Sequence, residues 1–483
     1  MSRTLTLNRK NIPQDEEQST EVIIGVYDAL LPCRNYKIEH KIAEVGKVSL
    51  TTEFLLRLVH SIDGVPEAEV AKFFDFSPQE MTFLLNDAVS LDYVSREAGR
   101  LWLTPAGRGL FLQNDDEPQI FNVEKRNWTQ GFDLVSFAPQ EKDRTEPFDN
   151  HLHVLEVDQN LVSRGKEQVP PSFKKHFAEI TSKQGLRSLL KRSLYSIDSV
   201  SPEDKFSAVV PIIVKASQPS LNIGEPDLLE WRPDHELDDR APIAGAIGRF
   251  VESLRVQYPE HVMADYELLL ELAPEFLRSY STKSGLSVDR YLRDAVSLKD
   301  HKFKINRKTV AIVGPFFSEK NAEVLLEAVA RAVVYTPAAC IPPKFYWRAP
   351  LRRFWGATRA LPNIVARVQS LIADKLGDDE SPPVSVIMLE KNWHSPHRAF
   401  TEKQYFDNGS PPQSVEIFLV PGVAAGVLIH LPGASTSGHV VPLGFMSVDP
   451  LVIFRIEEYL KQYGPLVVPQ ERVTEEDLDL PEE

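Results

Sequence analysis

The most constraining feature of this chain is a run of three short helical patterns over residues 50–112, separated by strong stop signals. Apolar residues recur at helical spacing in each pattern. Asp63-Gly64 ends the first helix, and Ser77-Pro78 begins the third, where Glu80 completes a capping box. The residues expected to face inward are Val70, Phe73, Phe74, Met81, Leu84, Leu85 and Ala88.

Two short strand patterns follow the third helix. Residues 93–95 and 101–103 are mainly apolar and flank a polar turn that contains Gly99, which predicts a hairpin. Three helices followed by a hairpin are typical of a winged helix, whose third helix lies in the major groove of DNA. The sequence therefore predicts a winged-helix domain over 22–115. A helical bundle without that topology is the alternative.

The charge of this domain argues against the usual mode of duplex recognition. Residues 51–112 hold five Lys/Arg against nine Asp/Glu, a net charge of −4, and no Lys or Arg lies in the third helix. The phosphate groups of DNA would repel a domain surface with this net negative charge. The basic residues of the hairpin and the turn after it are Arg96, Arg100 and Arg108. Either these arginines contact nucleic acid, or the domain binds another protein.

Composition describes an ordinary globular protein. A length of 483 residues predicts about three domains, and 42% hydrophobic and 25% charged residues are typical of soluble folds. No apolar run approaches the roughly 20 residues of a membrane span, and the polar N-terminus lacks a signal peptide. Cys33 and Cys340 cannot form a disulfide framework. We expect a cytoplasmic protein without a cofactor, and its net charge of −15 argues against non-specific coating of nucleic acid.

Changes in pattern along the chain predict an α/β protein, α+β overall. A strand at 309–313, a helix at 319–332 and a strand at 333–335 form a β-α-β pattern, which favours a parallel sheet with a right-handed crossover. The predicted parts are a flexible arm (1–21), the winged-helix domain (22–115), a mixed α/β middle region (116–304), a C-terminal β/α domain with a mainly parallel sheet (305–465) and an acidic tail (466–483).

A window without acidic residues is the strongest charge anomaly. Residues 328–373 contain seven Lys/Arg and no Asp or Glu, and aromatic residues interleave with them. Arginines bind phosphate oxygens and aromatic rings stack on bases, so this basic-aromatic strip suits nucleic acid or a phosphate pocket. Trp, Tyr and Arg also dominate protein interfaces, and some of these residues could belong to the core. The candidate contacts are Lys344, Trp347, Arg348, Arg352, Arg353, Trp355 and Arg359.

Two histidine pairs are candidate sites. His151 and His153 lie two apart in a strand predicted over 151–157, so both point to one face and could hold a metal. No third ligand is identifiable, and a surface or inter-domain pair is the favoured interpretation. His430 and His439 flank the small-residue loop 433–438, which could cradle a phosphate or simply connect two strands.

The order of these parts resembles bacterial proteins that join a winged helix to a phospholipase-D-like domain and are often found in anti-phage defence operons. The resemblance covers 50–112 and, loosely, 305–463. That family's catalytic signature is His-x-Lys followed by an aspartate, usually twice. No His-x-Lys occurs in this chain. The resemblance therefore implies a degenerate phospholipase-D-like domain whose nuclease or lipase chemistry is lost.

The first interpretation is a DNA-associated or complex-assembling subunit of a bacterial multiprotein system, without enzymatic activity of its own. Its partners would be nucleic acid, most simply DNA, and protein subunits of the same system. The alternative is a nuclease or phosphate-ester hydrolase in the C-terminal domain. It would use His394 and His397, which follow a predicted strand end. A second alternative is an adaptor that binds only protein.

Overall fold

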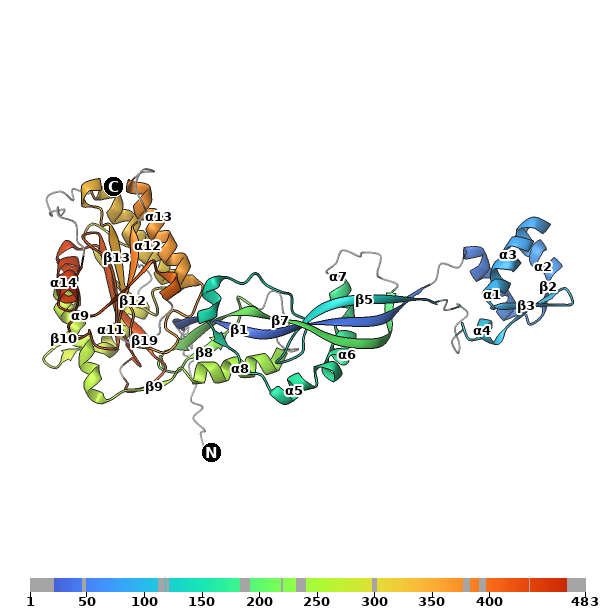
Figure 1. Ribbon diagram of the computed structural model, residues 1–483, viewed down its shortest axis with the longest axis horizontal. Coiled ribbons are helices and arrows are strands. Elements are labelled where there is room, and N and C mark those ends of the chain that lie inside the picture. Colours follow the sequence, from blue (N-terminus) through green and yellow to red (C-terminus); the bar gives the residue numbers. More distant parts are fainter. Residues whose placement is uncertain are drawn as a thin grey trace, which may run out of the picture. The chain divides into compact units, whose positions relative to one another are not determined.

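The structure, a computed structural model, describes residues 21–45, 49–111, 118, 121–182, 192–218, 220–231, 240–297, 302–376, 383–390, 397–433 and 435–466 (Figure 1). The chain is a mixed α+β protein that divides into two compact units. One unit comprises 33–141 and 158–206, and the other comprises 1–32, 142–157 and 207–483. Most of the predicted arm and of the acidic tail lies outside the described residues. In the part of the chain that the structure describes, no helix is long and apolar enough to cross a membrane.

Residues 49–111 form a helical module with its own core (Figure 1). Helix α3 begins where the sequence predicts, because Ser77 and Glu80 form the capping box. A short strand that was not predicted, β2, joins the hairpin in a sheet of order β2-β4-β3. The elements are α1 Leu50–Ser61, β2 Val65–Pro66, α2 Glu67–Phe74, α3 Pro78–Ser90, β3 Val94–Glu97, β4 Arg100–Leu103 and α4 Pro105–Arg108.

The predicted inward residues of this module are confirmed with one clear exception. Val70, Met81, Leu84, Leu85 and Ala88 are buried together. Phe74 is half-buried against the same core. Phe73 was also predicted to face inward, but its side chain is 70% exposed. Helix α2 is only two turns long, so one side of it is enough to cover the core.

The same unit contains parts of three long strands and three helices. Strand β1 Glu21–Val45 pairs antiparallel with β5 Phe121–Asp133, from Cys33 opposite Asp133 to Val45 opposite Phe121. The sheet continues from β1 to β7 Arg192–Ser217. Phe173 and Phe177 pack edge-on against His40 of β1. The helices are α5 Gln159–Ser163, α6 Gly165–Lys175 and α7 Phe177–Ser182.

The other unit is built on a seven-stranded sheet of order β12-β19-β17-β16-β13-β14-β15. Figure 1 shows α14 and α9 on one side of the sheet, and α12 and α13 on the other. Every residue of β16, β17 and β19 is buried, as expected for strands covered on both faces. The strands are β12 Thr309–Val313, β13 Lys344–Arg348, β14 Val384–Leu389, β15 Glu402–Tyr405, β16 Val415–Val420, β17 Ala424–Leu431 and β19 Val441–Ser447; the helices are α12 Glu319–Tyr335, α13 Ala360–Leu376 and α14 Pro450–Lys461.

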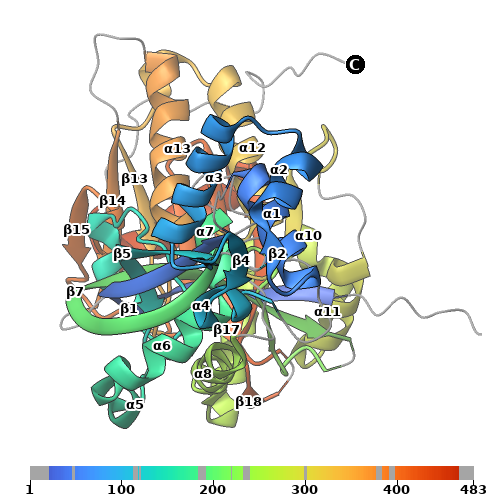
Figure 2. The same ribbon diagram turned by 90° about the vertical axis from the view of Figure 1, so that its right-hand side faces the viewer.

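The sheet is mixed, which corrects the prediction of a mainly parallel sheet. Its two parallel pairings join β13, β14 and β15 at one edge (Figure 2), and its other four are antiparallel. The predicted strand at 333–335 is the last turn of α12, where Val333 faces the core. The short connections from β16 to β17 and from β17 to β19 produce antiparallel neighbours. The crossover through α13 does place β14 parallel to β13.

Shorter elements surround this sheet. The strand predicted over 151–157 is reduced to β6, since a 3-10 turn occupies 147–151. Pro274 begins α10 and separates it from α9. The remaining elements are η1 Pro147–His151, β6 His153–Val154, β8 Glu225–Asp227, α8 Ala241–Glu252, β9 Val256–Gln257, η5 Glu260–Tyr266, α9 Glu267–Leu272, α10 Pro274–Leu277, η6 Arg278–Tyr280, β10 Ser281–Thr282, β11 Gly285–Leu286, α11 Val288–Ser297, η7 Ala338–Cys340, η8 His397–Ala399 and β18 Ser437–Gly438.

Candidate functional site

The basic-aromatic strip does not form a continuous exposed surface. Strand β13 is an inner strand of the sheet, between β16 and β14, and its residues 345–348 are all buried. Trp347 and Arg348 are at most 1% exposed, and Trp355 is 4% exposed. The expectation that these three residues face a ligand is therefore wrong.

The guanidinium of Arg348 is held by backbone carbonyl groups and lies near a carboxylate. Its Nη2 donates to the carbonyl oxygen of Pro411 at 3.0 Å and its Nη1 to that of Val415, while Glu390 lies 3.7 Å away. Burial lowers the pKa of Arg348 to about 10, and the nearby Glu390 carboxylate opposes this shift. The guanidinium thus ties the loop before β16 to β13 from inside the unit.

Several other cations of the strip also have partners within their unit. Arg359 forms a two-pronged ion pair with Asp149, with N–O distances of 2.9 and 2.7 Å. Lys344 lies 2.6 Å from Glu402, and Arg352 donates to the hydroxyl of Tyr27 at 2.7 Å. Arg353 is exposed, and its guanidinium lies over the ring of Phe354, 4.6 Å from the centroid. Carboxylates outside the acid-free window therefore neutralise part of its charge.

The hairpin arginines of the helical module are exposed, and two of them have partners. Arg96 forms a two-pronged ion pair with Glu67, which raises the pKa of Arg96. Arg100 donates from Nη1 to the carbonyl oxygen of Gly64 at 2.9 Å. Arg108 lies at the end of α4 with its side chain in solvent. These three residues give the module only a small basic edge.

The histidine candidates do not assemble a site in the described residues. His151 ends the turn η1, whereas His153 lies in β6 and stacks on Phe250, 4.6 Å between centroids. No group of three His, Cys, Asp or Glu there could hold a metal ion. His394 lies outside the described residues, and His397 is described only as the first residue of η8. The expectation that His151 and His153 lie in one strand is therefore wrong.

His430 belongs to a buried polar cluster rather than a phosphate loop. Its Nε2 lies 2.5 Å from Glu416 Oε2, and Glu416 Oε1 accepts the indole N–H of Trp347 at 2.8 Å. Burial lowers the pKa of His430, although Glu416 opposes this shift. His439 is also buried and accepts the N–H of Gly224 at 2.9 Å. His430 is 1% exposed, so the cluster holds three strands together and offers no reactive atom to a substrate.

A candidate site open to solvent is a groove in the helical module between the start of α1 and α3. Its volume is about 430 Å³. Phe83 of α3 projects beside it and is 80% exposed. The acidic residues Glu80 and Asp87 lie in the same lining, and Asp87 accepts the buried hydroxyl of Thr52 at 3.1 Å. The lining residues are Ser49, Thr51, Thr52, Phe76, Gln79, Glu80, Phe83, Leu84 and Asp87.

The inward residues predicted for the third helix leave Phe83 unassigned, so the sequence analysis did not predict the groove beside it. Phe83 falls between Met81 and Leu84, which face the core, and so it points away from them. An aromatic residue outside the apolar stripe of an amphipathic helix was the available signal. Together with Phe73 and Leu50, which are 70% and 69% exposed, Phe83 gives the acidic module exposed apolar side chains.

Comparison with known proteins gives no family for the chain: no family model, no curated protein and no solved structure matches it.

Proposed function

We propose that this chain is a complex-assembling subunit that binds a partner protein through the groove of its helical module. The observation that carries the proposal is Phe83, an aromatic side chain 80% exposed beside a groove of about 430 Å³. Exposed aromatic residues next to a cavity are the usual anchors of protein interfaces. On this proposal the module is a winged helix whose third helix contacts protein.

The charge of the groove defines the partner. Glu80 and Asp87 are lining residues, and residues 51–112 carry a net charge of −4. An amphipathic helix fits such a groove when its apolar side covers Phe83 and Leu84 and its Lys or Arg residues reach the acids. The partner is therefore a basic, amphipathic helical segment.

Direct DNA binding by this module has less support. The third helix offers no positive charge, and Arg96 and Arg100 already have partners. Association with DNA would then come through the partner protein. Because the chain resembles winged-helix proteins with a phospholipase-D-like domain, we propose that it works in a bacterial defence system in the cytoplasm. No observation on the described residues favours the hydrolase alternative, and its candidate His394 lies outside them.

Peptide binding to the full chain tests the proposal. The probe is a fluorescent helical peptide with Leu at positions i, i+3, i+4 and i+7 and Lys elsewhere, and a scrambled peptide of the same composition is the control. We expect Phe83→Ser to weaken binding about 30-fold, as at an interface hot spot. Tyr195→Ser is the matched variant, because Tyr195 is also exposed, at 66%, and lies outside the groove.

The outcomes separate the proposal from its competitor. Equal binding by wild type and Phe83→Ser, or equal binding of both peptides, contradicts the groove. A mobility shift with a DNA duplex at two salt concentrations provides the second arm. Salt-sensitive duplex binding that Arg108→Ala reduces and Phe83→Ser leaves unchanged would replace protein docking by DNA contact through the basic edge.

A further inference from the structure

Residues 183–191, which lie outside the described residues, have the sequence of a basic amphipathic segment. The three leucines of this segment recur at the spacing i, i+3 and i+4, which would place them on one side of a helix. Its three cationic residues flank these leucines, and it contains no Asp or Glu. The leucines are Leu186, Leu189 and Leu190, and the cationic residues are Lys183, Arg187 and Lys191. The segment therefore has the chemistry that the groove beside Phe83 requires of its partner.

The groove of the helical module presents the complementary pattern. Its residues from α3 include Glu80, Phe83, Leu84 and Asp87, which follow one another at the spacing i, i+3, i+4 and i+7. The two acids therefore lie on either side of the apolar pair. Both carboxylates accept hydrogen bonds from neutral donors, and within the described residues neither has a cationic partner. Their negative charges are available to a basic ligand.

The two patterns also match in length. Glu80 and Asp87 are seven residues apart, which is a rise of about 10 Å along α3. Lys183 and Lys191 are eight residues apart, and a helix over this segment would separate them by about 12 Å. Such a helix would place a cation near each acid while its leucines cover Phe83.

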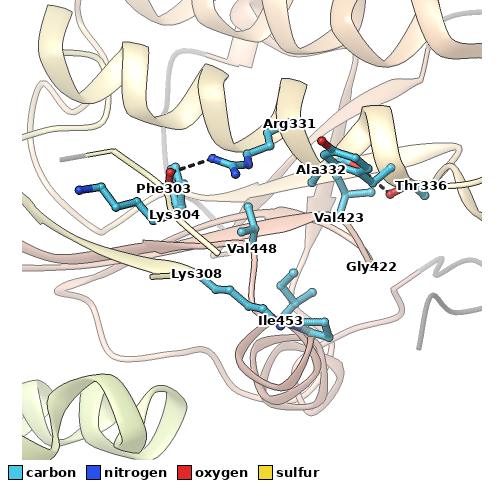
Figure 3. A pocket seen from close by; sticks show the side chains of 12 residues that line it. Phe303, Lys304, Lys308, Arg331, Ala332, Thr336, Gly422, Val423, Val448 and Ile453 are labelled. Atoms are coloured by element: carbon cyan, nitrogen blue, oxygen red, sulfur yellow. Dashed lines mark hydrogen bonds between the residues drawn. The ribbon is translucent and has the colours of Figure 1, made fainter. Parts of the chain in front are cut away.

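A second pocket of the protein does not suit this segment. The pocket lined by Phe303, Arg331 and Val448 lies in the unit of the seven-stranded sheet (Figure 3). It encloses only about 60 Å³, and none of its lining residues is acidic. It offers neither the space nor the charge for a basic helix, whereas the groove of about 430 Å³ offers both.

The direction of β7 determines where residues 183–191 are attached. Asp198 of β7 lies 3.2 Å from Lys41 of β1, whereas Asp204, later in β7, accepts a hydrogen bond at 2.9 Å from Asn35, earlier in β1. The two neighbouring strands therefore run antiparallel. The beginning of β7 consequently lies at the end of the sheet where β1 ends.

The groove is a short length of chain away from that end of the sheet. Strand β1 ends at Val45, and Ser49 already lines the groove. Four residues span at most about 14 Å. The segment 183–191 precedes β7, which begins at Arg192, and its nine residues can extend up to about 30 Å. The segment and the groove of one chain are therefore tethered to the same end of one sheet.

We propose that residues 183–191 dock in the groove of their own chain and compete there with the partner protein. This inference rests on the proposed function, because it takes the same groove as the docking site. A short flexible connection gives such a segment an effective concentration of about 1 mM. With a Kd of about 0.1 mM, the segment would occupy roughly nine-tenths of the grooves and lower the apparent affinity for the partner about tenfold.

Peptide binding to the full chain tests this docking. The probe is the fluorescent Leu/Lys helical peptide that tests the groove itself. We expect the double variant Leu186→Ser, Leu189→Ser to bind this probe about tenfold more tightly than wild type, because its groove is no longer occupied. Leu161→Ser is the control and should bind as wild type does, because Leu161 is an exposed leucine of α5, at 38%, outside the groove.

Charge reversal provides an independent variant. The double variant Arg187→Glu, Lys191→Glu should also bind the probe more tightly, because like charges then oppose docking of the segment beside the acids of the groove. Its matched control is Lys166→Glu, Lys174→Glu, which makes the same change in net charge at two exposed positions of α6. We expect the gain in the first variant to exceed the gain in the control several-fold.

The Phe83→Ser variant separates the two proposals. If Phe83→Ser weakens probe binding but the leucine variant binds as wild type does, the groove remains the docking site and docking of 183–191 is wrong. If Phe83→Ser leaves probe binding unchanged, the groove itself is wrong and both proposals fall. Equal gains in the charge-reversed variant and its control would also overturn docking of the segment.

The concentration dependence shows which chain supplies the segment. Docking within one chain predicts the same gain in affinity at every protein concentration. A dimer that analytical ultracentrifugation detects in wild type and that the leucine variant dissolves would overturn docking within one chain and assign the segment to a second copy.

Discussion

The ion pair between Arg359 and Asp149 offers the sharpest test of how this fold is held together. Arg359 follows β13 in the chain, and Asp149 lies in the turn η1. Two N–H groups of the guanidinium reach the two carboxylate oxygens at 2.9 and 2.7 Å. The side chain of Asp149 is 5% exposed, whereas that of Arg359 is 29% exposed. We predict that Arg359→Met destabilises the protein by leaving a buried carboxylate without its cation.

The expected loss of stability follows from the exposed fractions of these two side chains. Removing one partner of a fully buried pair costs about 3–5 kcal/mol. Arg359 is partly in water, which screens the pair, so we expect about 2–3 kcal/mol in the free energy of unfolding. Methionine retains most of the apolar stem. The backbone N–H of residue 359, which donates to Asp28 at 2.6 Å, is not affected.

A double-mutant cycle isolates the ion pair. Urea unfolding of wild type, Arg359→Met, Asp149→Asn and the double variant would be followed by circular dichroism at pH 7. Asparagine retains an acceptor for the N–H of Glu146, which donates to Asp149 at 2.8 Å. We expect Arg359→Met to cost at least about 1.5 kcal/mol less in the Asp149→Asn background. Additive effects within about 0.5 kcal/mol would refute the ion-pair explanation.

The pH dependence gives an independent check. Burial alone would raise the pKa of Asp149, but the hydrogen bonds from Arg359, the N–H of Glu146 and the positive charge of Arg359 together outweigh burial and hold this pKa below its ordinary value. The stabilisation is therefore present above the unfolded pKa, about 4, and is lost as pH falls through the folded one. The difference between wild type and Arg359→Met should shrink below about pH 4. A difference that does not change with pH would indicate lost packing instead.

Two further predictions concern buried polar groups. Burial lowers the pKa of His430, so this histidine binds a proton more readily in the unfolded protein than in the folded protein. The free energy of unfolding should therefore fall as pH drops below about 6.5. His430→Gln should reduce that loss between pH 7 and pH 5 in urea titrations, and an unchanged slope would contradict the assignment. Tyr266 donates its buried hydroxyl to the carbonyl oxygen of Gly433 at 2.9 Å. Tyr266→Phe should cost about 1–2 kcal/mol in the same assay, whereas no cost would mean that this bond adds nothing.

Local signals predicted much of the secondary structure. The capping box of α3 involves residues three apart, and the break between α9 and α10 comes from Pro274 itself. Sheet topology was predicted poorly, because strand partners are distant in the chain. The apolar triplet 333–335 is equally compatible with a strand and a last helical turn, and the length of α12 decides between them.

The environment of the candidate contact residues was predicted even less well, because their partners are also distant in the chain. The acid-free window is a property of the sequence, but Asp149 lies 210 residues before Arg359 and Glu402 lies 58 residues after Lys344. Nothing local to the window indicates that carboxylates reach it. The exposure of Phe83 could be predicted from its position outside the apolar stripe of α3. The groove beside Phe83 depends on how α1 packs on α3.

The sequence by itself determined where some helices and strands begin and end, such as the start of α3 and the bounds of β12, and also the net negative charge of the helical module. Those properties depend on side chains a few positions apart or on composition alone. Only the tertiary structure decided the mixed order of the sheet, the burial of Trp347 and Arg348, and the position of the groove beside Phe83. Burial and charge pairing depend on residues that meet only when distant segments fold together, and a linear pattern does not specify which segments meet.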